Sequence, residues 1–223
     1  MVQKRKKTSH EPTRKEVNPK TDNQALLIDS IESGDITICI GPAGTGKTYI
    51  SVGMAVKLYY EGVIDKIILC RPAVEAGRQI GFLPGSQEEK LAPYLRPLFD
   101  ELKNFMSIYD IAKLQNEEII EVAPLEFMRG RTMKNAFVIL DEAQNATREQ
   151  LKMFVTRIGE GAKFVINGDV DQSDLPISQR ENLKILVERL GFLEEVKIVK
   201  MGRIDIVRHP IIERLLQHLT DYN

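Results

Sequence analysis

One short segment of the sequence has the residue types that hold phosphate. An apolar run at residues 36–40 leads directly into the octapeptide Gly41-Pro42-Ala43-Gly44-Thr45-Gly46-Lys47-Thr48, and an amphipathic segment follows it. Glycines let the backbone bend so that its N–H groups face inward, and the following helix presents its positive end to phosphate. We expect Lys47 to reach the terminal phosphates and Thr48 to ligate magnesium. The octapeptide therefore predicts binding of a nucleoside triphosphate with Mg²⁺.

A second segment supplies the acidic groups that triphosphate hydrolysis requires. Residues 136–140 read as an apolar strand, and Asp141 and Glu142 follow it directly. Asp141 is expected to hold Mg²⁺ through water, and Glu142 to polarise the attacking water. Two carboxylates at a strand end are a weak signal alone, since many strand ends are simply solvated. About a hundred residues after a phosphate-binding loop, they have the spacing of a magnesium-binding strand and predict a nucleoside triphosphatase.

The rest of the chain alternates between strand and helix patterns. Strands are predicted at residues 35–40, 66–70, 119–122, 136–140, 162–167 and 196–200. Helices are predicted at residues 23–33, 47–61, 147–158, 182–190 and 206–219, the last of them broken or started near Pro210. Wholly apolar strands that alternate with helices indicate an α/β fold, with a parallel central sheet and helices on both faces. Residues 72–116 are predicted to be a helical insertion, whose helix at 87–106 is interrupted at Pro93 and Pro97.

Length and composition limit the class of protein. With 223 residues and 43% apolar content, the chain is long enough for one domain with a real core. Residues 1–20 carry seven basic and two acidic side chains, a balance of +5 that leaves −6 for residues 21–223. This basic tail is predicted to be disordered, and residues 21–223 to form the phosphate-binding domain. Contact of the tail with nucleic-acid phosphates and a merely solubilising role both stay open.

The cysteines, histidines and apolar runs indicate where the protein works. Cys39 and Cys70 lie in apolar runs and are interpreted as core residues, which suits a reducing cytoplasm. No run is long enough to span a membrane, and no signal peptide follows the charged N-terminus, so a soluble cytoplasmic protein is expected. His10, His209 and His218 lack ligand spacing, so we expect no structural metal.

Two motifs resemble those of superfamily 1 helicases. Residues 141–144, DEAQ, are similar to one form of motif II, and residues 168–172, GDVDQ, follow a strand as motif III does. In those helicases the motif III glutamine senses the γ-phosphate and couples it to the nucleic-acid track. The resemblance implies this role for Gln172. An ordinary polar turn is the alternative interpretation of the second motif.

Longer motifs, in order from about Gln24 to the C-terminus, resemble those of the PhoH family. They are GPAGTGKT at residues 41–48, RPAVEAG at 71–77, GFLPG at 81–85, PYLRP at 93–97, RGRT at 129–132, LDEAQN at 140–145, KMFVTR at 152–157 and VRH at 207–209. The chain departs from the family pattern at Arg78, where an acidic residue is usual, and at Asn167, where a small or hydroxyl residue is usual. Neither position is one of the expected hydrolytic residues.

The resemblance implies an ATPase with a RecA-like core that uses ATP and Mg²⁺. RNA unwinding or RNA metabolism is shown or proposed for some members of the family, so coupling of hydrolysis to RNA or another single-stranded nucleic acid is also implied. A nucleotide-gated RNA-binding module without unwinding activity is the first alternative. A small-molecule kinase is the second, disfavoured because Glu142 suits a water nucleophile and no lid is recognisable.

The helicase resemblance also bears on the adenine contact and on the arginine at the γ-phosphate. Gln24 stands about seventeen residues before the loop, where these helicases place an adenine-reading glutamine, and Asn23 suits a helix N-cap. Superfamily 1 helicases clamp the γ-phosphate with arginines from a second domain, for which this chain is too short. Arg208 is the first candidate for this role, acting in trans within a homo-oligomeric ring such as a hexamer. Arg157 and Arg203 come behind it, and a surface ion pair is the preferred interpretation for both.

Arg71 ends a predicted strand at the edge where parallel sheets bind ligands. The matching helicase motif contacts single-stranded nucleic acid, and with Arg129, Arg131 and Thr132 it would form a groove that tracks phosphates. Aromatic residues for base stacking are scarce, since the chain has no Trp. Two interpretations of these arginines stay open: a nucleic-acid groove, and solvated or intersubunit salt bridges.

Overall fold

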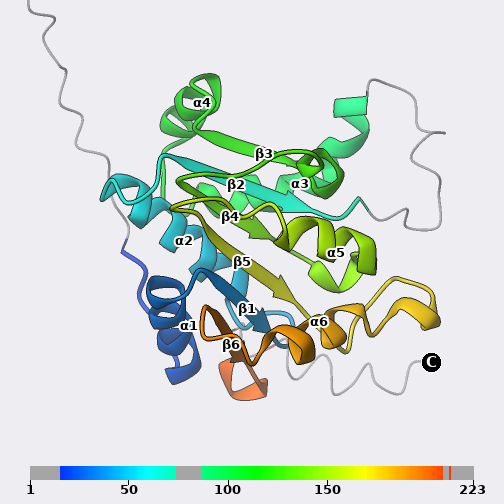
Figure 1. Cartoon of the computed structure of the whole chain (residues 1–223). Helices are drawn as coiled ribbons and strands as arrows, with labels where there is room; N and C mark the ends of the chain where they lie inside the picture. The colour runs from blue at the N-terminus through cyan, green and yellow to red at the C-terminus, as the bar shows by residue number, and fades with distance from the viewer. Residues whose placement is uncertain (1–15, 74–86, 208–210, 212–223) are drawn as a thin grey trace, which may run out of the picture.

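A parallel sheet places the expected site residues at one edge. The computed structural model describes residues 16–73, 87–207 and 211. These residues form a six-stranded sheet in the order β3-β2-β4-β5-β1-β6, with every neighbouring pair parallel (Figure 1). The strands are β1 (Ile36–Ile40), β2 (Lys66–Arg71), β3 (Ile120–Pro124), β4 (Ala136–Leu140), β5 (Lys163–Gly168) and β6 (Val196–Lys200). The expected α/β class is confirmed.

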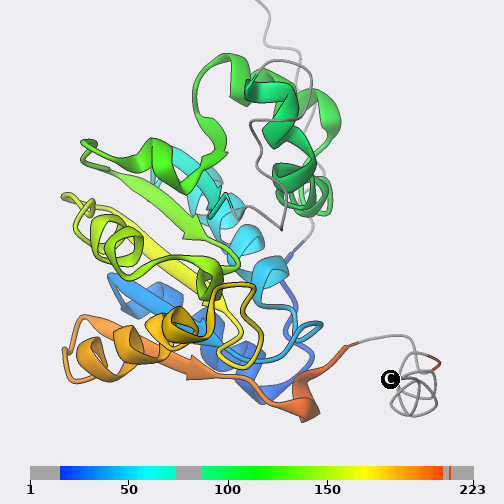
Figure 2. The same cartoon turned by 90° about the vertical axis from the view of Figure 1, so that its right-hand side faces the viewer.

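Helices cover both faces of this sheet, as the sequence pattern predicts (Figure 2). One face packs against α1 (Asp22–Ser33), α2 (Lys47–Tyr60), α3 (Gln87–Leu102) and α4 (Ile108–Asn116), and the other against α5 (Arg148–Val155) and α6 (Asn182–Leu190). Among the described residues, none of the helices combines the length and apolar character that crossing a membrane requires.

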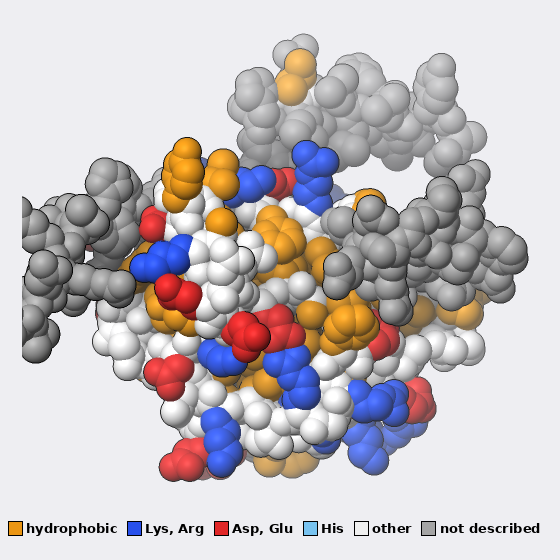
Figure 3. Space-filling model, turned by 90° about the horizontal axis from the view of Figure 1, so that it is seen from above, with side chains coloured by type: hydrophobic (Ala, Val, Ile, Leu, Met, Phe, Trp, Pro, Cys, Tyr) orange, Lys and Arg blue, Asp and Glu red, His pale blue; other side chains and the backbone are white. Residues whose placement is uncertain are grey.

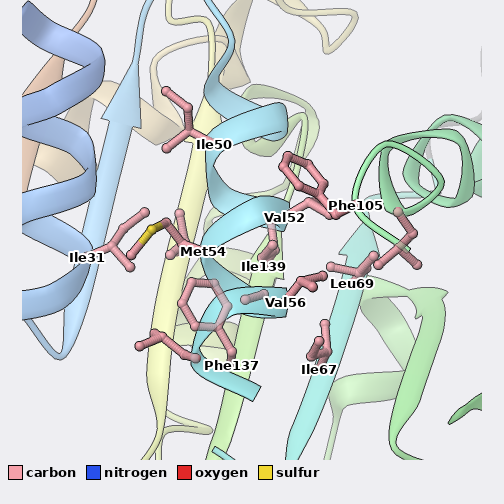
Figure 4. Packing of buried hydrophobic residues seen from close by; sticks show 14 of the residues in the cluster. Ile31, Ile50, Val52, Met54, Val56, Ile67, Leu69, Phe105, Phe137 and Ile139 are labelled. Carbon is pink, nitrogen blue, oxygen red and sulfur yellow. The ribbon is translucent and has the colours of Figure 1, made fainter. Parts of the chain in front are cut away.

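β4 shows how one strand serves both layers of the core. Successive side chains of a strand point to opposite faces of the sheet. Phe137 and Ile139 therefore pack beneath α2, beside Met54, whereas Val138 and Leu140 join the cluster beneath α5 (Figure 4). Because both faces are covered, β4 is one continuous buried apolar run, and its rigid end carries Asp141 into the site.

Both cysteines are buried core residues, as expected. Cys39 on β1 and Cys70 on β2 have no exposed surface and form no disulfide. Burial raises the pKa of the Cys39 thiol to about 12, and burial also raises the pKa of the Cys70 thiol. Because a protonated thiol is a poor nucleophile and a poor metal ligand, the two residues contribute packing.

The helix of the insertion differs from the prediction. α3 continues through Pro93 and Pro97, so the expected interruption is wrong. Each proline lacks the N–H that would bond to a carbonyl one turn earlier. Both prolines are exposed and lie one helical turn apart, on the same side of α3, where water can hydrate the freed carbonyls. α4 then begins at an N-cap, Ser107, whose Oγ accepts from the Asp110 N–H at 3.1 Å.

The ends of the chain and the start of the insertion are described only in part. The basic tail lies outside the described residues up to residue 15, and Val17 packs against the core beneath α2. Residues 74–86, which include Arg78 and the GFLPG segment, also lie outside the described residues. The closing helix is expected at residues 206–219, broken or started near Pro210, and Ile206 and Val207 are not helical. Residue 211 is helical, and the remainder of that expected helix lies outside the described part.

Candidate active site

The loop between β1 and α2 folds as its glycine pattern predicts. Gly44 and Gly46 have φ angles of 85° and 84°, in the left-handed region that favours glycine. A Cβ at Gly41 would lie 2.5 Å from the Met201 carbonyl oxygen, so only glycine allows this approach. α2 begins at Lys47, which places the positive end of its dipole at the loop.

Contacts from both ends of the chain hold this loop in place. The Gln24 amide nitrogen donates to the Thr45 carbonyl at 2.9 Å. The Val207 N–H donates to the Gly44 carbonyl, also at 2.9 Å. Gln24 belongs to helix α1 and Val207 to the segment after β6, so elements far apart in the sequence fix the conformation of the loop.

The Lys47 ammonium lies across its own loop. It donates to the Gly41 carbonyl at 2.7 Å and to the Pro42 carbonyl at 2.9 Å. An ammonium offers three donors and a full positive charge, which suits the oxygens of a triphosphate. Lys47 also lines the cavity beside this loop, and its contact with the terminal phosphates stays a prediction.

Thr48 and Asp141, the two expected magnesium ligands, are in direct contact. The Thr48 hydroxyl donates to Asp141 Oδ1 at 2.8 Å. Asp141 Oδ2 accepts from Arg71 Nε at 2.9 Å and from Arg71 Nη2 at 2.5 Å. Asp141 is only 2% exposed, and the guanidinium compensates its buried charge. Hydroxyl and carboxylate oxygens are the ligands that Mg²⁺ prefers, so this pair fits the ion.

Glu142 has an unusual backbone conformation directly after β4. Its φ of 55° and ψ of 39° lie in the left-handed region, which is costly for a residue other than glycine. Its Oε2 accepts from Gln144 Nε2 at 2.6 Å, and its Oε1 lies 3.7 Å from Arg71 Nη2. The side chain is 48% exposed, so water reaches it. Strain of this kind is typical of functional turns.

Gln144 links Glu142 to the loop that follows β5. Its Nε2 donates to Glu142, and its Oε1 accepts from the Asp169 N–H at 3.0 Å. Ser173 Oγ donates to the Gln144 carbonyl at 2.9 Å, which ties the two loops a second time. Gln144 belongs to the DEAQ motif and Asp169 to the GDVDQ motif. Because the two motifs follow neighbouring strands of the sheet, their contact could have been expected from the sequence.

A cavity of about 700 Å³ lies where these loops meet. Its lining includes the expected site residues Gln24, Ala43, Gly44, Gly46, Lys47, Thr48, Asp141, Glu142 and Gln172. Gly41, Pro42 and Thr45 are not part of this lining. Thr45 instead supports the loop from within, since its buried hydroxyl donates to the Pro42 carbonyl at 3.0 Å.

The insertion contributes an acidic side chain that no sequence motif marks. Glu101 of α3 lines the same cavity. Burial raises its pKa and the charge of Asp141 raises it further, against a hydrogen bond from Asn104 that lowers it. Because its place depends on how α3 packs against α2, no local pattern in the sequence could have identified Glu101.

Asn167, one of the two departures from the family pattern, is accommodated inside the protein. It is fully buried on β5, and its Nδ2 donates to Ser51 Oγ at 3.0 Å. Ser51 Oγ in turn donates to the Lys47 carbonyl at 2.8 Å. The residue therefore joins β5 to the first turn of α2, beneath the phosphate-binding loop.

The start of α1 corrects the expected helix cap. Thr21 is the N-cap, because its Oγ1 accepts from the Gln24 N–H at 3.3 Å, and Asn23 instead donates to Asp205 at 2.8 Å. Both polar atoms of the Gln24 amide form hydrogen bonds: Nε2 donates to the Thr45 carbonyl, and Oε1 accepts from the Lys20 N–H at 2.7 Å. Gln24 lies beside the loop as expected, and its reading of adenine stays a prediction.

Asp205 joins α1 to the segment after β6. It is fully buried and accepts hydrogen bonds from Thr21 Oγ1 at 2.5 Å, and from Asn23 Nδ2 and the Gly202 N–H at 2.8 Å each. Burial raises the pKa of Asp205, but these three hydrogen bonds lower it more, so the pKa lies below its ordinary value. This cluster fixes the segment from which Val207 holds the loop.

We expect Asp205→Asn to lower the free energy of unfolding near neutral pH. The lowered pKa in the folded state means that the stabilisation is present above the unfolded-state value and is lost as pH falls through the folded-state value. Urea unfolding at a series of pH values checks this. The difference in the free energy of unfolding between wild type and Asp205→Asn should be constant above about pH 5 and should decrease below about pH 4. A gap that does not change with pH would contradict this account, and Asp29→Asn, on the exposed side of α1, is the control.

The arginines of the expected groove are divided between separate ion pairs. Arg71 is held by the carboxylate of the expected magnesium site, whereas Arg131 makes hydrogen bonds of 2.5 and 2.7 Å to Glu121. Arg129 and Thr132 are exposed. On the face that carries β3 and α4, basic and acidic side chains are interspersed among the described residues (Figure 3). For Arg71 and Arg131 the structure favours salt bridges, formed within one chain.

The three candidates for a γ-phosphate arginine have different positions. Arg208, the first choice, lies outside the described residues. Arg203 is exposed. Arg157 donates to the carbonyls of Met153 at 3.1 Å and Arg131 at 3.3 Å, so backbone hydrogen bonds replace the expected surface ion pair.

The fold and the site define a P-loop nucleotide-binding domain with a RecA-like core. A glycine loop leads from β1 into α2, and a carboxylate at the end of β4 meets the threonine of that loop. The large terminase of a thermophilic bacteriophage has the same fold, with a TM-score of 0.55 and 14% identity over 90% of this chain and 50% of the terminase.

The chain belongs to the PhoH family. The family's model, described as PhoH-like protein, matches residues 16–220. PhoH-like proteins from Mycobacterium leprae (strain TN) and Bacillus subtilis (strain 168) are 47% and 46% identical to it, over 93% and 94% of this chain. The chain spans 60% of the mycobacterial relative and 66% of the Bacillus relative.

Proposed function

We propose that this protein hydrolyses ATP with Mg²⁺ in the cavity between the loop at 41–48 and the ends of β4 and β5. The observation that carries the proposal is the 2.8 Å contact between the Thr48 hydroxyl and Asp141, with Glu142 next in the chain. Lys47 and these three residues line one cavity. A site that only binds nucleotide needs the first carboxylate but not the second, so Glu142 favours hydrolysis.

Each side chain has a separate part in this chemistry. Thr48 and Asp141 would hold Mg²⁺, which would supply positive charge to the phosphates of ATP. Lys47 binds the terminal phosphate oxygens, and Gln172 contacts the γ-phosphate. Glu142 accepts a proton from the attacking water. Arg71 orients Asp141 and compensates its charge through two hydrogen bonds.

We further propose that RNA or another single-stranded nucleic acid stimulates this hydrolysis. Membership of the PhoH family supports the proposal, as does the position of Arg71, which joins the end of β2 to the site carboxylate. The two free buried cysteines suit a cytoplasmic setting.

The test is phosphate release from ATP with no nucleic acid, single-stranded RNA, an RNA duplex and single-stranded DNA, each at two salt concentrations. Stimulation by RNA that weakens at high salt supports coupling. Stimulation without strand separation would identify a nucleotide-gated RNA-binding module. Turnover that no nucleic acid changes would remove the coupling and leave the ATPase.

A neighbouring copy of the chain is proposed to complete the site, with Arg208 acting in trans. Exposed apolar side chains beside the loop support an interface there, since Ile204 is 85% and Val207 41% exposed. Arg208→Ala and Glu142→Gln, each inactive alone, should recover turnover when mixed, and light scattering should give a mass above that of a monomer. A monomer whose mixed variants stay inactive would refute the trans arrangement and favour a contribution in cis.

A further inference from the structure

Asp169 has a buried carboxylate oxygen that none of the roles above uses. The residue follows β5 and is 7% exposed. Its Oδ1 accepts from the Asp171 N–H at 3.0 Å, and its own N–H donates to Gln144 Oε1 at 3.0 Å. Among the described residues its Oδ2 has no hydrogen-bond partner, and Asp169 lines the nucleotide cavity. One oxygen of this carboxylate therefore organises its own loop, and the other is buried without a partner in a residue that lines the cavity.

An unpaired buried carboxylate oxygen is costly, so its presence needs a reason. A buried charge is ordinarily paired or hydrogen-bonded at each oxygen. None of the ion pairs among the described residues includes Asp169. For the loop alone, a neutral asparagine would serve as well, because its Oδ1 can also accept from the Asp171 N–H. The second carboxylate oxygen is useful only if a donor in the cavity meets it.

The attacking water of ATP hydrolysis is such a donor. A water that directs a lone pair at phosphorus has two O–H groups, and both are oriented when each meets an acceptor. Glu142 supplies one acceptor: Gln144 engages its Oε2, while its Oε1 lies 3.7 Å from Arg71 Nη2 and can accept a hydrogen bond from the water. The second acceptor has to come from another element that lines the same cavity. Asp169 meets this condition. Gln144 connects it to Glu142, because the Gln144 amide forms hydrogen bonds of 2.6 Å with Glu142 and 3.0 Å with the Asp169 N–H.

We propose that Asp169 is a second catalytic carboxylate, whose Oδ2 accepts a hydrogen bond from the attacking water while Glu142 removes the other proton. This inference rests on the proposed ATP hydrolysis. In the step, the water oxygen bonds to the γ-phosphorus, and the bond from that phosphorus to the β–γ bridging oxygen breaks. Its electron pair leaves on ADP. Glu142 takes one proton and later releases it to solvent, and Asp169 exchanges no proton in the step.

The test compares Asp169→Asn with wild type and with Asp171→Asn. The first variant keeps the shape of the side chain and places a donor where Oδ2 was. We expect its kcat to fall by about 100-fold, with the Kd of a fluorescent ATP analogue changed less than about threefold. Trapping of ADP with aluminium fluoride, which mimics the transition state, should be lost, and the melting temperature should not fall. Asp171 is exposed in the same loop, so Asp171→Asn should match wild type in every measurement.

Two results would overturn the role of Asp169: turnover of Asp169→Asn within about threefold of wild type, or a fall in melting temperature that accounts for the lost activity. The trapping experiment separates this inference from the proposed function. If wild type binds ATP but does not hydrolyse it, the proposed function fails. In that case, the role of Asp169 stands only if wild type traps ADP with aluminium fluoride and Asp169→Asn does not. If both proteins trap equally, the role of Asp169 is refuted.

Discussion

Glu142→Gln is expected to lower ATP turnover by about 10³-fold while ATP still binds. Glutamine has nearly the same shape as glutamate but cannot take a proton from water. In the proposed site, the loop at 41–48 supplies the phosphate contacts, and Thr48 and Asp141 supply the metal contacts. Binding of ATP is therefore expected not to depend on Glu142. Phosphate release measures the turnover, and titration with a fluorescent ATP analogue measures the binding.

Glu149→Gln is the matched control for this variant. Glu149 is exposed in the first turn of α5, a few residues beyond Glu142, so the same substitution there should leave turnover unchanged. Undiminished phosphate release by Glu142→Gln would remove Glu142 as the base. Loss of ATP binding in parallel with turnover would instead show that its strained turn supports the loop.

Lys47→Ala should weaken ATP binding by about 100-fold or more, because charge-assisted hydrogen bonds to the terminal phosphates are lost. In the structure this ammonium also bridges the carbonyls of Gly41 and Pro42, so its removal loosens the loop. If Lys47 reaches the terminal phosphates, the loss should be larger for ATP than for ADP. Calorimetric titration of both nucleotides measures this difference.

Lys57→Ala, on the same helix, controls for loss of a positive charge on α2. Lys57 is paired with Glu32 at 2.6 Å on the surface, at the end of α2 away from the loop, and its side chain is 43% exposed. An exposed pair of this kind contributes little, so binding of both nucleotides should stay as in wild type. Equal losses for ATP and ADP in Lys47→Ala would place the ammonium away from the γ-phosphate.

The parts of the fold that sequence predicts well are those fixed by local pattern. β4 and α6 begin and end at the expected residues, because buried strands and amphipathic helices have their own periodicities. The loop at 41–48 is equally local, since its glycines and the helix after it specify its conformation. The contact between Thr48 and Asp141 follows from topology, because parallel strands end at the same edge of the sheet.

The parts that sequence does not predict depend on packing between distant segments. Glu101 reaches the cavity only because α3 lies against α2. The helix α3 continues through Pro93 and Pro97, both of which are exposed. The cap of α1 moves to Thr21 because Asp205, from the other end of the chain, engages Asn23. None of these contacts leaves a spacing or motif that a single sequence displays.

The most direct test of the central claim is a single-turnover measurement of ATP cleavage, with protein in excess over labelled ATP. Wild type with Mg²⁺ should convert the bound ATP to ADP and phosphate, and chelation of Mg²⁺ should stop the reaction. Glu142→Gln under the same conditions should hold the ATP intact. Bound ATP that wild type leaves uncleaved with Mg²⁺, or cleavage by Glu142→Gln at the rate of wild type, would contradict the assignment of this site as an ATPase.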